Sequence, residues 1–390
     1  MSTSVAALWG GTTTIMDFGI PRDHSETPLD AAINKMALAE RSRCDVGLHG
    51  SVINWDPSVP RQLEQLATLG IRSVKLYMTN RGTTIADNDT VLKVMHEMVR
   101  LDGLVYIHAE HDAIIVDSTR THADHGRISI EDLHQTRPAL AEEASVREVI
   151  AMAQYTGAPV YFVHQSTAVA VDLVVDARRA GLNIHSEACP HYLLIDDSCY
   201  RGAKSAWYAC CPPMRPKSTV TALRQRFVDG AFDTISSDHS CYTLAQKQEH
   251  RTDTRLMPHG LPGVETRMPA SFTALMPPSG TGEDSVKSNL LQRFVDVFSA
   301  GPARINGLTG KGKIAPGYDA DLVIFDPHEV RTVDAAALHM GTDFSPFHGR
   351  SLQGWPQVVV SAGRVVLDEG ELKDPGPRGR FLSRAGYHEP

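Results

Sequence analysis

Apolar and polar positions follow two different periods along the chain. Short runs rich in β-branched residues are each followed by a stretch in which apolar residues recur every three or four positions. Runs of the first kind predict buried strands, and stretches of the second kind predict helices that pack one face on a sheet. The predicted strands are residues 13–18, 46–53, 73–78, 104–108, 159–164, 183–187 and 234–237. The predicted helices between them include residues 30–41, 59–69, 90–101, 141–155 and 168–180.

Glycines stand where four of these helices should end, at Gly70, Gly103, Gly157 and Gly181. A glycine in the left-handed conformation commonly follows the last helical residue. Strands that alternate with helices form βαβ units and a parallel sheet. The predicted fold class is therefore α/β, and a TIM-type (β/α)8 barrel matches the length best. Only seven strands can be counted, one fewer than such a barrel needs.

The pattern changes after residue 309. Residues 320–326 and 358–368 are apolar runs bounded by Gly turns, which predicts part of a small β-sandwich. The last residues are rich in Pro, Gly and Arg and predict a loose arm. We therefore expect the barrel over residues 1–309, the C-terminal part of the β-sandwich over 310–372, and the arm over 373–390.

Composition narrows the class of protein. The 390 residues carry a formal net charge of -8, with Lys and Arg scattered, which argues against nucleic acid and anionic membranes as partners. No apolar run approaches the roughly 18 residues needed to span a bilayer, and the N-terminus lacks the pattern of a signal peptide. We expect a cytoplasmic protein whose six cysteines, which show no CxxC spacing, are reduced thiols.

Residues able to bind a metal stand at the ends of four predicted strands. These are Lys75, His108, His164 and Asp238. The active site of a parallel barrel is built at the carboxyl ends of its strands, because the βα loops open there. A single histidine in such a place is more often structural, and a single lysine usually reaches solvent. Four such residues in register favour a metal site.

Several segments carry a resemblance to a known family. They are GGTTTIMDF (10–18), VKLYMTNRG (74–82), HAEH (108–111), YFVHQS (161–166), EACPHYLLID (187–196), CPPMR (211–215), SSDHS (236–240) and GKGKIAPGYDADLVIFD (310–326). In order and spacing the chain resembles the hydantoinase and dihydropyrimidinase family of the amidohydrolase superfamily. The resemblance extends to about residue 382.

The resemblance implies a site with two divalent metal ions, with zinc as the expected metal. Lys75 would react with CO2 to give N6-carboxylysine, whose carbamate oxygens would bridge the two ions. The two ions would share a water and lower its pKa. His108 and His164 would bind one ion. Asp238 would bind the other ion and act as the catalytic general base. The family also implies a homotetramer that acts on a small cyclic amide.

The sequence departs from the family in its metal ligands. Members carry an HxH pair at the end of the first barrel strand, and no HxH occurs in this sequence. The chain begins where the helix after that strand should lie, so the resemblance implies a TIM-type (β/α)8 barrel that lacks its first strand. We expect an N-terminal truncation, from a wrong start codon or a gene fragment. One metal would then keep only Asp238 and the carbamate, and ring opening by this chain is expected to be slow or absent.

Three further positions concern the substrate. Asn80 stands where the family has a tyrosine that helps hold the substrate. Cys211 and His259 stand where the family often has Ser and Asn, at positions that contact the cyclic amide largely through backbone groups.

Three functions stay open. The first is hydrolysis of hydantoins or 5,6-dihydropyrimidines, and the second is allantoinase-like hydrolysis, because the SDHS (237–240) and CPHY (189–192) segments also resemble allantoinases. The third is a non-catalytic dihydropyrimidinase-related protein, because the HxH ligands are absent. Retention of the other four ligands argues against the last.

Overall fold

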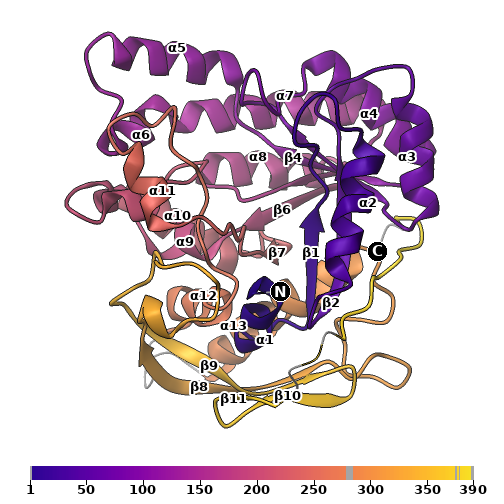
Figure 1. Cartoon of the computed structure of the whole chain (residues 1–390), viewed down its shortest axis with the longest axis vertical. Coiled ribbons are helices and arrows are strands. Elements are labelled where there is room, and N and C mark those ends of the chain that lie inside the picture. The colour runs from indigo at the N-terminus through magenta and orange to yellow at the C-terminus, as the bar shows by residue number, and fades with distance from the viewer. Residues whose placement is uncertain (1, 278–283, 374–375, 377, 388–390) are drawn as a thin grey trace.

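Seven parallel strands form the main sheet of the protein (Figure 1). The computed structural model describes residues 2–277, 284–373, 376 and 378–387. The strands pair in chain order, so each strand lies between its sequence neighbours, as βαβ units require. They are β1 (Thr14–Phe18), β2 (Asp45–Ser51), β3 (Ser73–Tyr77), β4 (Leu104–His108), β5 (Val160–Phe162), β6 (Ile184–Ala188) and β7 (Thr234–Ile235). All seven predicted strands are confirmed.

Helices follow the strands and cover the outer face of the sheet (Figure 1). Side chains of Thr27, Asp87 and Thr167 cap three of them by accepting backbone N–H groups. The helices are α1 (Ser2–Trp9), α2 (Pro28–Ala39), α3 (Val59–Thr68), α4 (Asn88–Arg100), α5 (Asp112–Ala123), α6 (Leu133–Thr136), α7 (Ala139–Thr156), α8 (Ala168–Arg179), α9 (Pro190–Leu194), α10 (Lys217–Val228), α11 (Leu244–Glu249), α12 (Arg267–Leu275), α13 (Asp284–Val295) and α14 (Gly301–Ile305).

Three of the four predicted glycine ends are confirmed. Gly70, Gly157 and Gly181 have φ values of 80°, 74° and 91°, which a residue without a Cβ adopts at little cost. The prediction is wrong for Gly103, because Asp102 before it takes the left-handed conformation instead, with φ 51°. Asp is among the side chains that tolerate this region.

The sheet is open between β7 and β1. Within the described ranges no strand joins these two edges, which confirms a TIM-type barrel without its first strand. Arg267 on α12 reaches across this side: Nη1 donates to the Ile235 carbonyl at 3.0 Å and Nη2 to Thr12 Oγ1 at 3.2 Å. One side chain therefore ties the last strand to the residues that lead into the first.

The C-terminal segment forms a second, antiparallel sheet with strand order β11-β10-β9-β8. In Figure 1 it lies below the barrel strands, with α1 and α12 packed on it. Phe272 of α12 contacts Phe325 with ring centroids 5.0 Å apart, and Leu8 of α1 shares a buried cluster with Val359. The strands are β8 (Leu322–Thr332), β9 (Ser351–Ser361), β10 (Arg364–Asp368) and β11 (Glu371–Leu372).

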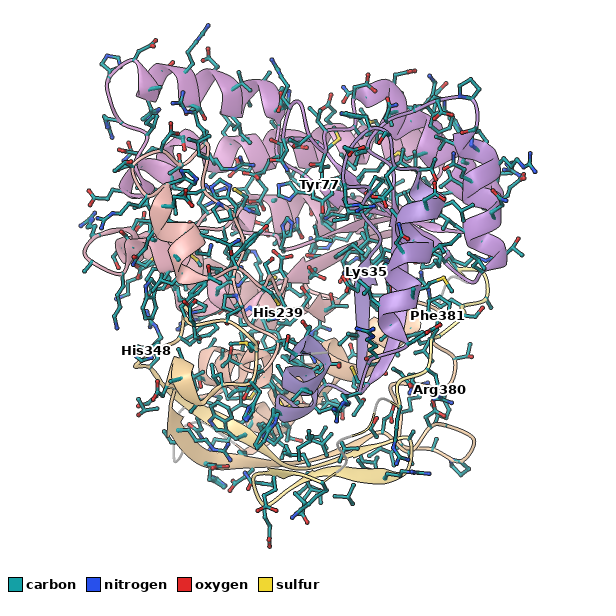
Figure 2. All side chains as sticks on the ribbon, in the orientation of Figure 1. Lys35, Tyr77, His239, His348, Arg380 and Phe381 are labelled. Carbon is teal, nitrogen blue, oxygen red and sulfur yellow. The ribbon has the colours of Figure 1, made fainter. Side chains whose placement is uncertain are left out.

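The arm is not loose where the structure describes it. Phe381 pairs with Val46 of β2 as a parallel bridge, and the Tyr387 N–H donates to the Asp102 carbonyl at 2.8 Å. Arg380 and Phe381 lie beside β2 and α2 (Figure 2). The expectation of a loose arm was wrong, because Pro and Gly content does not reveal backbone groups that find partners far along the chain.

A buried ion cluster joins the arm, the barrel and the second sheet. Lys311 Nζ contacts Asp45 at 2.7 Å and Asp319 at 2.9 Å, and also contacts Asp321. Arg380 donates to Asp45 at 2.7 Å. The carboxylates surround Lys311 so closely that the pKa of Lys311 is raised despite its burial.

Among the helices that the structure describes, none combines the length and the apolar composition needed to cross a membrane.

Candidate functional site

The four predicted metal-site residues lie toward the carboxyl ends of four strands. His108 is the last residue of β4, His164 lies two positions after β5, and Asp238 lies three positions after β7. Lys75 is in the middle of β3 rather than at its end, because Leu76 and Tyr77 continue the strand. His164 and Asp238 have φ values of 39° and 43°, a left-handed backbone that is uncommon outside glycine and often found at functional sites.

Three of these side chains meet in a buried space. Lys75, His108 and His164 are only 3–5% exposed. The rings of His108 and His164 lie edge to face with centroids 4.6 Å apart. Lys75 Nζ lies 4.9 Å from the centre of the Tyr77 ring, and that ring lies 5.6 Å from His108. The structure therefore brings the predicted lysine and histidines around one common space.

Burial sets the charge of these groups. It lowers the pKa of Lys75 to about 7, although the carboxylates of Asp238 and Glu187 oppose the shift. It also lowers the pKa of His108 and of His164, so both imidazoles are neutral, the form that binds metals. Burial raises the pKa of Asp238, against the attraction of Lys75 and His108. Near pH 7 the site thus holds two neutral imidazoles and an amine that is neutral in about half of the molecules, with the carboxyl groups of Asp238 and Glu187 close to that amine.

Two of the predicted substrate positions, Cys211 and His259, lie on segments joined by hydrogen bonds, and the third, Asn80, lies on a different loop. Cys211 and His259 are both half-buried. The charges of Arg137, Glu110 and Lys247 are close enough to both side chains to affect the pKa of each. Lys247, which is fully buried, donates to the Ala209 carbonyl at 2.7 Å and to the Pro258 carbonyl at 3.1 Å. It therefore ties together the two segments that carry Cys211 and His259.

Asn80 is exposed and belongs to the loop after β3. Its Nδ2 donates to Thr84 Oγ1 at 3.2 Å, so its amide is engaged within its own loop. Its φ of 73° is left-handed, which asparagine tolerates better than most residues.

Sequence reasoning missed three residues of the site: Tyr77, Glu110 and Glu187. Tyr77 stands two positions after Lys75 on the same strand. Because alternate residues of a strand point to the same face, this spacing could have indicated Tyr77. Glu110 likewise stands two positions after His108, but beyond the end of its strand. Glu187 accepts the His164 N–H at 2.9 Å and the Tyr161 hydroxyl at 2.6 Å. No local pattern marks Glu187, because its partners come from another strand.

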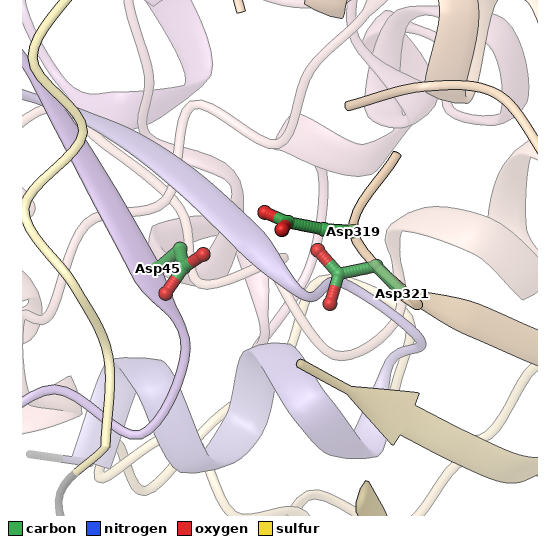
Figure 3. Close-up of side chains that lie close together, drawn as sticks. All are labelled: Asp45, Asp319 and Asp321. Atoms are coloured by element: carbon green, nitrogen blue, oxygen red, sulfur yellow. The ribbon is translucent and has the colours of Figure 1, made fainter. Parts of the chain in front are cut away.

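Another acidic group in the molecule resembles a metal site by distance alone. Oxygens of Asp45, Asp319 and Asp321 lie within 4.8 Å of one another, and no other such group of His, Cys, Asp and Glu occurs in the described part of the chain (Figure 3). Lys311 and Arg380 already neutralise these carboxylates. We therefore interpret this group as a structural ion cluster. The ligand atoms of His108, His164 and Asp238 do not all lie within 4.8 Å of one another, so the structure brings Asp238 less close to the two histidines than a shared metal ion would.

Comparison with known proteins places the chain in a family. Residues 1–366 match the amidohydrolase family. A D-hydantoinase of Ralstonia pickettii is 34% identical over 397 residues, which cover 100% of this chain and 84% of that protein. A D-phenylhydantoinase of Escherichia coli is 31% identical, with 99% of this chain and 82% of that protein covered.

Solved structures agree with the sequence comparison. Dihydropyrimidinase from Brevibacillus agri superposes with a TM-score of 0.93 at 30% identity, covering 100% of this chain and 84% of that one. L-hydantoinase from Arthrobacter aurescens gives 0.87 at 25% identity, covering 98% and 83%. Fold, sequence and length of the match agree, and the chain belongs to the hydantoinase and dihydropyrimidinase family of the amidohydrolase superfamily.

Proposed function

We propose that this protein hydrolyses the cyclic amide bond of hydantoins or 5,6-dihydropyrimidines. The observation that carries the proposal is the meeting of Lys75, His108 and His164 in one buried space, with Asp238 near enough to act on the charge of Lys75. Family membership supports the reaction class, because the relatives above are named for these rings.

The residues present fit one divalent metal ion well. Nδ1 of His164 is buried without a hydrogen-bond partner, so a ligand there would satisfy an otherwise unpaired atom. His108 keeps one ring nitrogen outside its hydrogen bond to Glu110. The amine of Lys75 is neutral in a large share of molecules near pH 7, as its reaction with CO2 to N6-carboxylysine requires. His108, His164 and carboxylated Lys75 would hold this ion.

A second ion fits less well. Asp238 and the Lys75 carbamate would be its ligands, whereas zinc usually takes four. No HxH pair occurs in the sequence to complete the set. When bound, the metal pair supplies a water of lowered pKa and polarises the amide carbonyl.

The chain's own residues supply the other parts of the chemistry. Asp238 accepts a proton from the attacking water and passes it to the leaving ring nitrogen. Backbone groups at Cys211 and His259 bind the ring, and the buried ammonium of Lys247 holds these two segments together. Burial around Lys75 and the histidines excludes competing water.

The test is ring opening of dihydrouracil and hydantoin, followed by absorbance, with Zn²⁺ and bicarbonate added. We expect the 390-residue chain to be slow or silent, and a fusion that supplies an HxH strand to turn over in a chelator-sensitive way. Asp238→Asn in the fusion is the control and should abolish turnover. Rapid turnover by the unmodified chain would contradict the two-metal requirement. Silence of the fusion on every cyclic amide would contradict the proposed function.

Allantoinase-like hydrolysis is the second candidate. It is supported by the SDHS (237–240) and CPHY (189–192) segments, which also resemble allantoinases, and by Asn80, which stands where the family has a tyrosine. Allantoin in the same assay distinguishes the two candidates. A non-catalytic role predicts metal binding with no turnover of any ring by either chain.

A further inference from the structure

We propose that Glu110 and Arg137 are positioning residues that fix the His108 ring for metal binding. The inference rests on the proposed function, because it takes His108 as a metal ligand. The observation is a chain of three buried side chains, in which Glu110 lies between the imidazole of His108 and the guanidinium of Arg137.

The contacts of Glu110 leave it no freedom to turn. Its Oε2 lies 2.7 Å from His108 Nε2 and 2.5 Å from Arg137 Nη2, and its Oε1 accepts from Arg137 Nε at 3.2 Å. Glu110 is 0% exposed, His108 4% and Arg137 7%. A buried carboxylate is stable as an anion only when it is paired and hydrogen-bonded, and the planar guanidinium supplies both.

The ionised carboxylate selects the tautomer of the histidine. A carboxylate can only accept hydrogen bonds, so His108 Nε2 must carry the proton. Nδ1 is then the bare nitrogen, whose lone pair can bind a metal ion. Ligating histidines commonly donate their other N–H to a carboxylate in this way, which fixes both tautomer and ring orientation.

The backbone of Arg137 is held by a second arginine, Arg215. The Arg137 carbonyl accepts a hydrogen bond from Arg215 Nη1 at 2.7 Å, and Arg215 Nε donates to Ser166 Oγ at 3.0 Å. Ser166 is two residues from His164, and its N–H donates to Glu142 at 2.8 Å. Because one network holds the loops that follow β4 and β5, both predicted metal histidines are fixed relative to each other.

The first experiment uses the unchanged, metal-free chain. Long-range nitrogen-15 NMR of the histidine rings at neutral pH, with His108 assigned by His108→Asn, reports which nitrogen carries the proton. We expect the Nε2–H form with an unprotonated Nδ1. The Nδ1–H form would overturn the proposal, whether or not the chain binds a metal.

The second experiment measures the affinity of the full chain for Co²⁺ by competition with a chelator. Glu110→Gln should weaken it by about 10–100-fold, the range seen when the carboxylate partner of a ligating histidine is removed. Arg137→Met should weaken it as well. Glu265→Gln is the matched control, since this carboxylate is also buried and also accepts from a histidine, His339, but lies outside the network around His108. Thermal unfolding confirms that each variant is folded.

The outcomes separate this inference from the proposed function. Equal losses in Glu110→Gln and Glu265→Gln would indicate general loosening and overturn the positioning role, as would an unchanged affinity in Glu110→Gln. If His108→Ala leaves Co²⁺ binding unchanged, the metal site of the proposed function fails. In that case the tautomer measurement still decides whether Glu110 orients the His108 ring, while the role in metal binding falls with the proposed function.

Discussion

The lowered pKa of Lys75 leads to the most direct prediction. In the folded protein this pKa falls from 10.5 to about 7, because burial removes water from the ammonium. At pH 7 an ordinary lysine is neutral in roughly one molecule in 3,000, whereas Lys75 is neutral in about half, a gain of about a thousandfold. Only the neutral amine attacks CO2, so this gain would favour the proposed carboxylation of Lys75 near neutrality.

The same shift affects stability, and its sign follows from proton binding. Since the folded pKa is lower than the unfolded one, the unfolded chain binds more protons between pH 7 and 10.5, and stability rises with pH over that window. At about 1.36 kcal/mol per pKa unit, the difference between 10.5 and about 7 corresponds to at most about 5 kcal/mol. Lys75→Met removes the buried ammonium and should stabilise the CO2-free protein at pH 6.

Carbon-13 NMR of protein labelled at lysine Cε measures the titration directly, with Lys75 assigned by Lys75→Met. We expect a midpoint near pH 7 in CO2-free, metal-free buffer. Lys311 is the internal control: its side chain is also buried, but three carboxylates raise its pKa above 10.5. A Lys75 midpoint above about 9.5, close to the ordinary value, would refute the argument that burial outweighs the nearby carboxylates.

Three other predictions follow from the contacts described above. Lys311→Met leaves Asp45, Asp319 and Asp321 without their buried cation and should lower the free energy of unfolding in urea by about 3–5 kcal/mol. The control is Arg380→Gln, which removes a more exposed cation and should lower it by about 1 kcal/mol or less. Equal losses would contradict the interpretation of the cluster as a structural one. Lys247→Met leaves the carbonyls of Ala209 and Pro258 without their hydrogen-bond donor. It should lower the free energy of unfolding, measured by thermal unfolding, by about 1–3 kcal/mol and weaken binding of the ring. Unchanged stability would show that the two hydrogen bonds contribute nothing. Sedimentation should give a homotetramer, and a monomer at all concentrations would contradict the association implied by the family resemblance.

The sequence alone determined the architecture and the family. Strand and helix periods are local properties, so the seven strands and the helices between them could be identified from patterns of a few residues. The order of the motifs around Lys75, His108, His164 and Asp238 indicated the family before any coordinates were considered. The absence of an HxH pair was also a property of the sequence, and so was the expected gap in the barrel.

Only the tertiary structure decided how the site is held and charged. The pKa of Lys75 depends on burial by strands far along the chain, which no local pattern encodes. Glu110 meets Arg137 across 27 positions, and Arg267 meets Thr12 across 255. The arm was predicted as loose for the same reason, since Phe381 finds its strand partner at Val46. Charge, desolvation and hydrogen bonding depend on which groups are brought into contact, and that is determined by the folded chain as a whole.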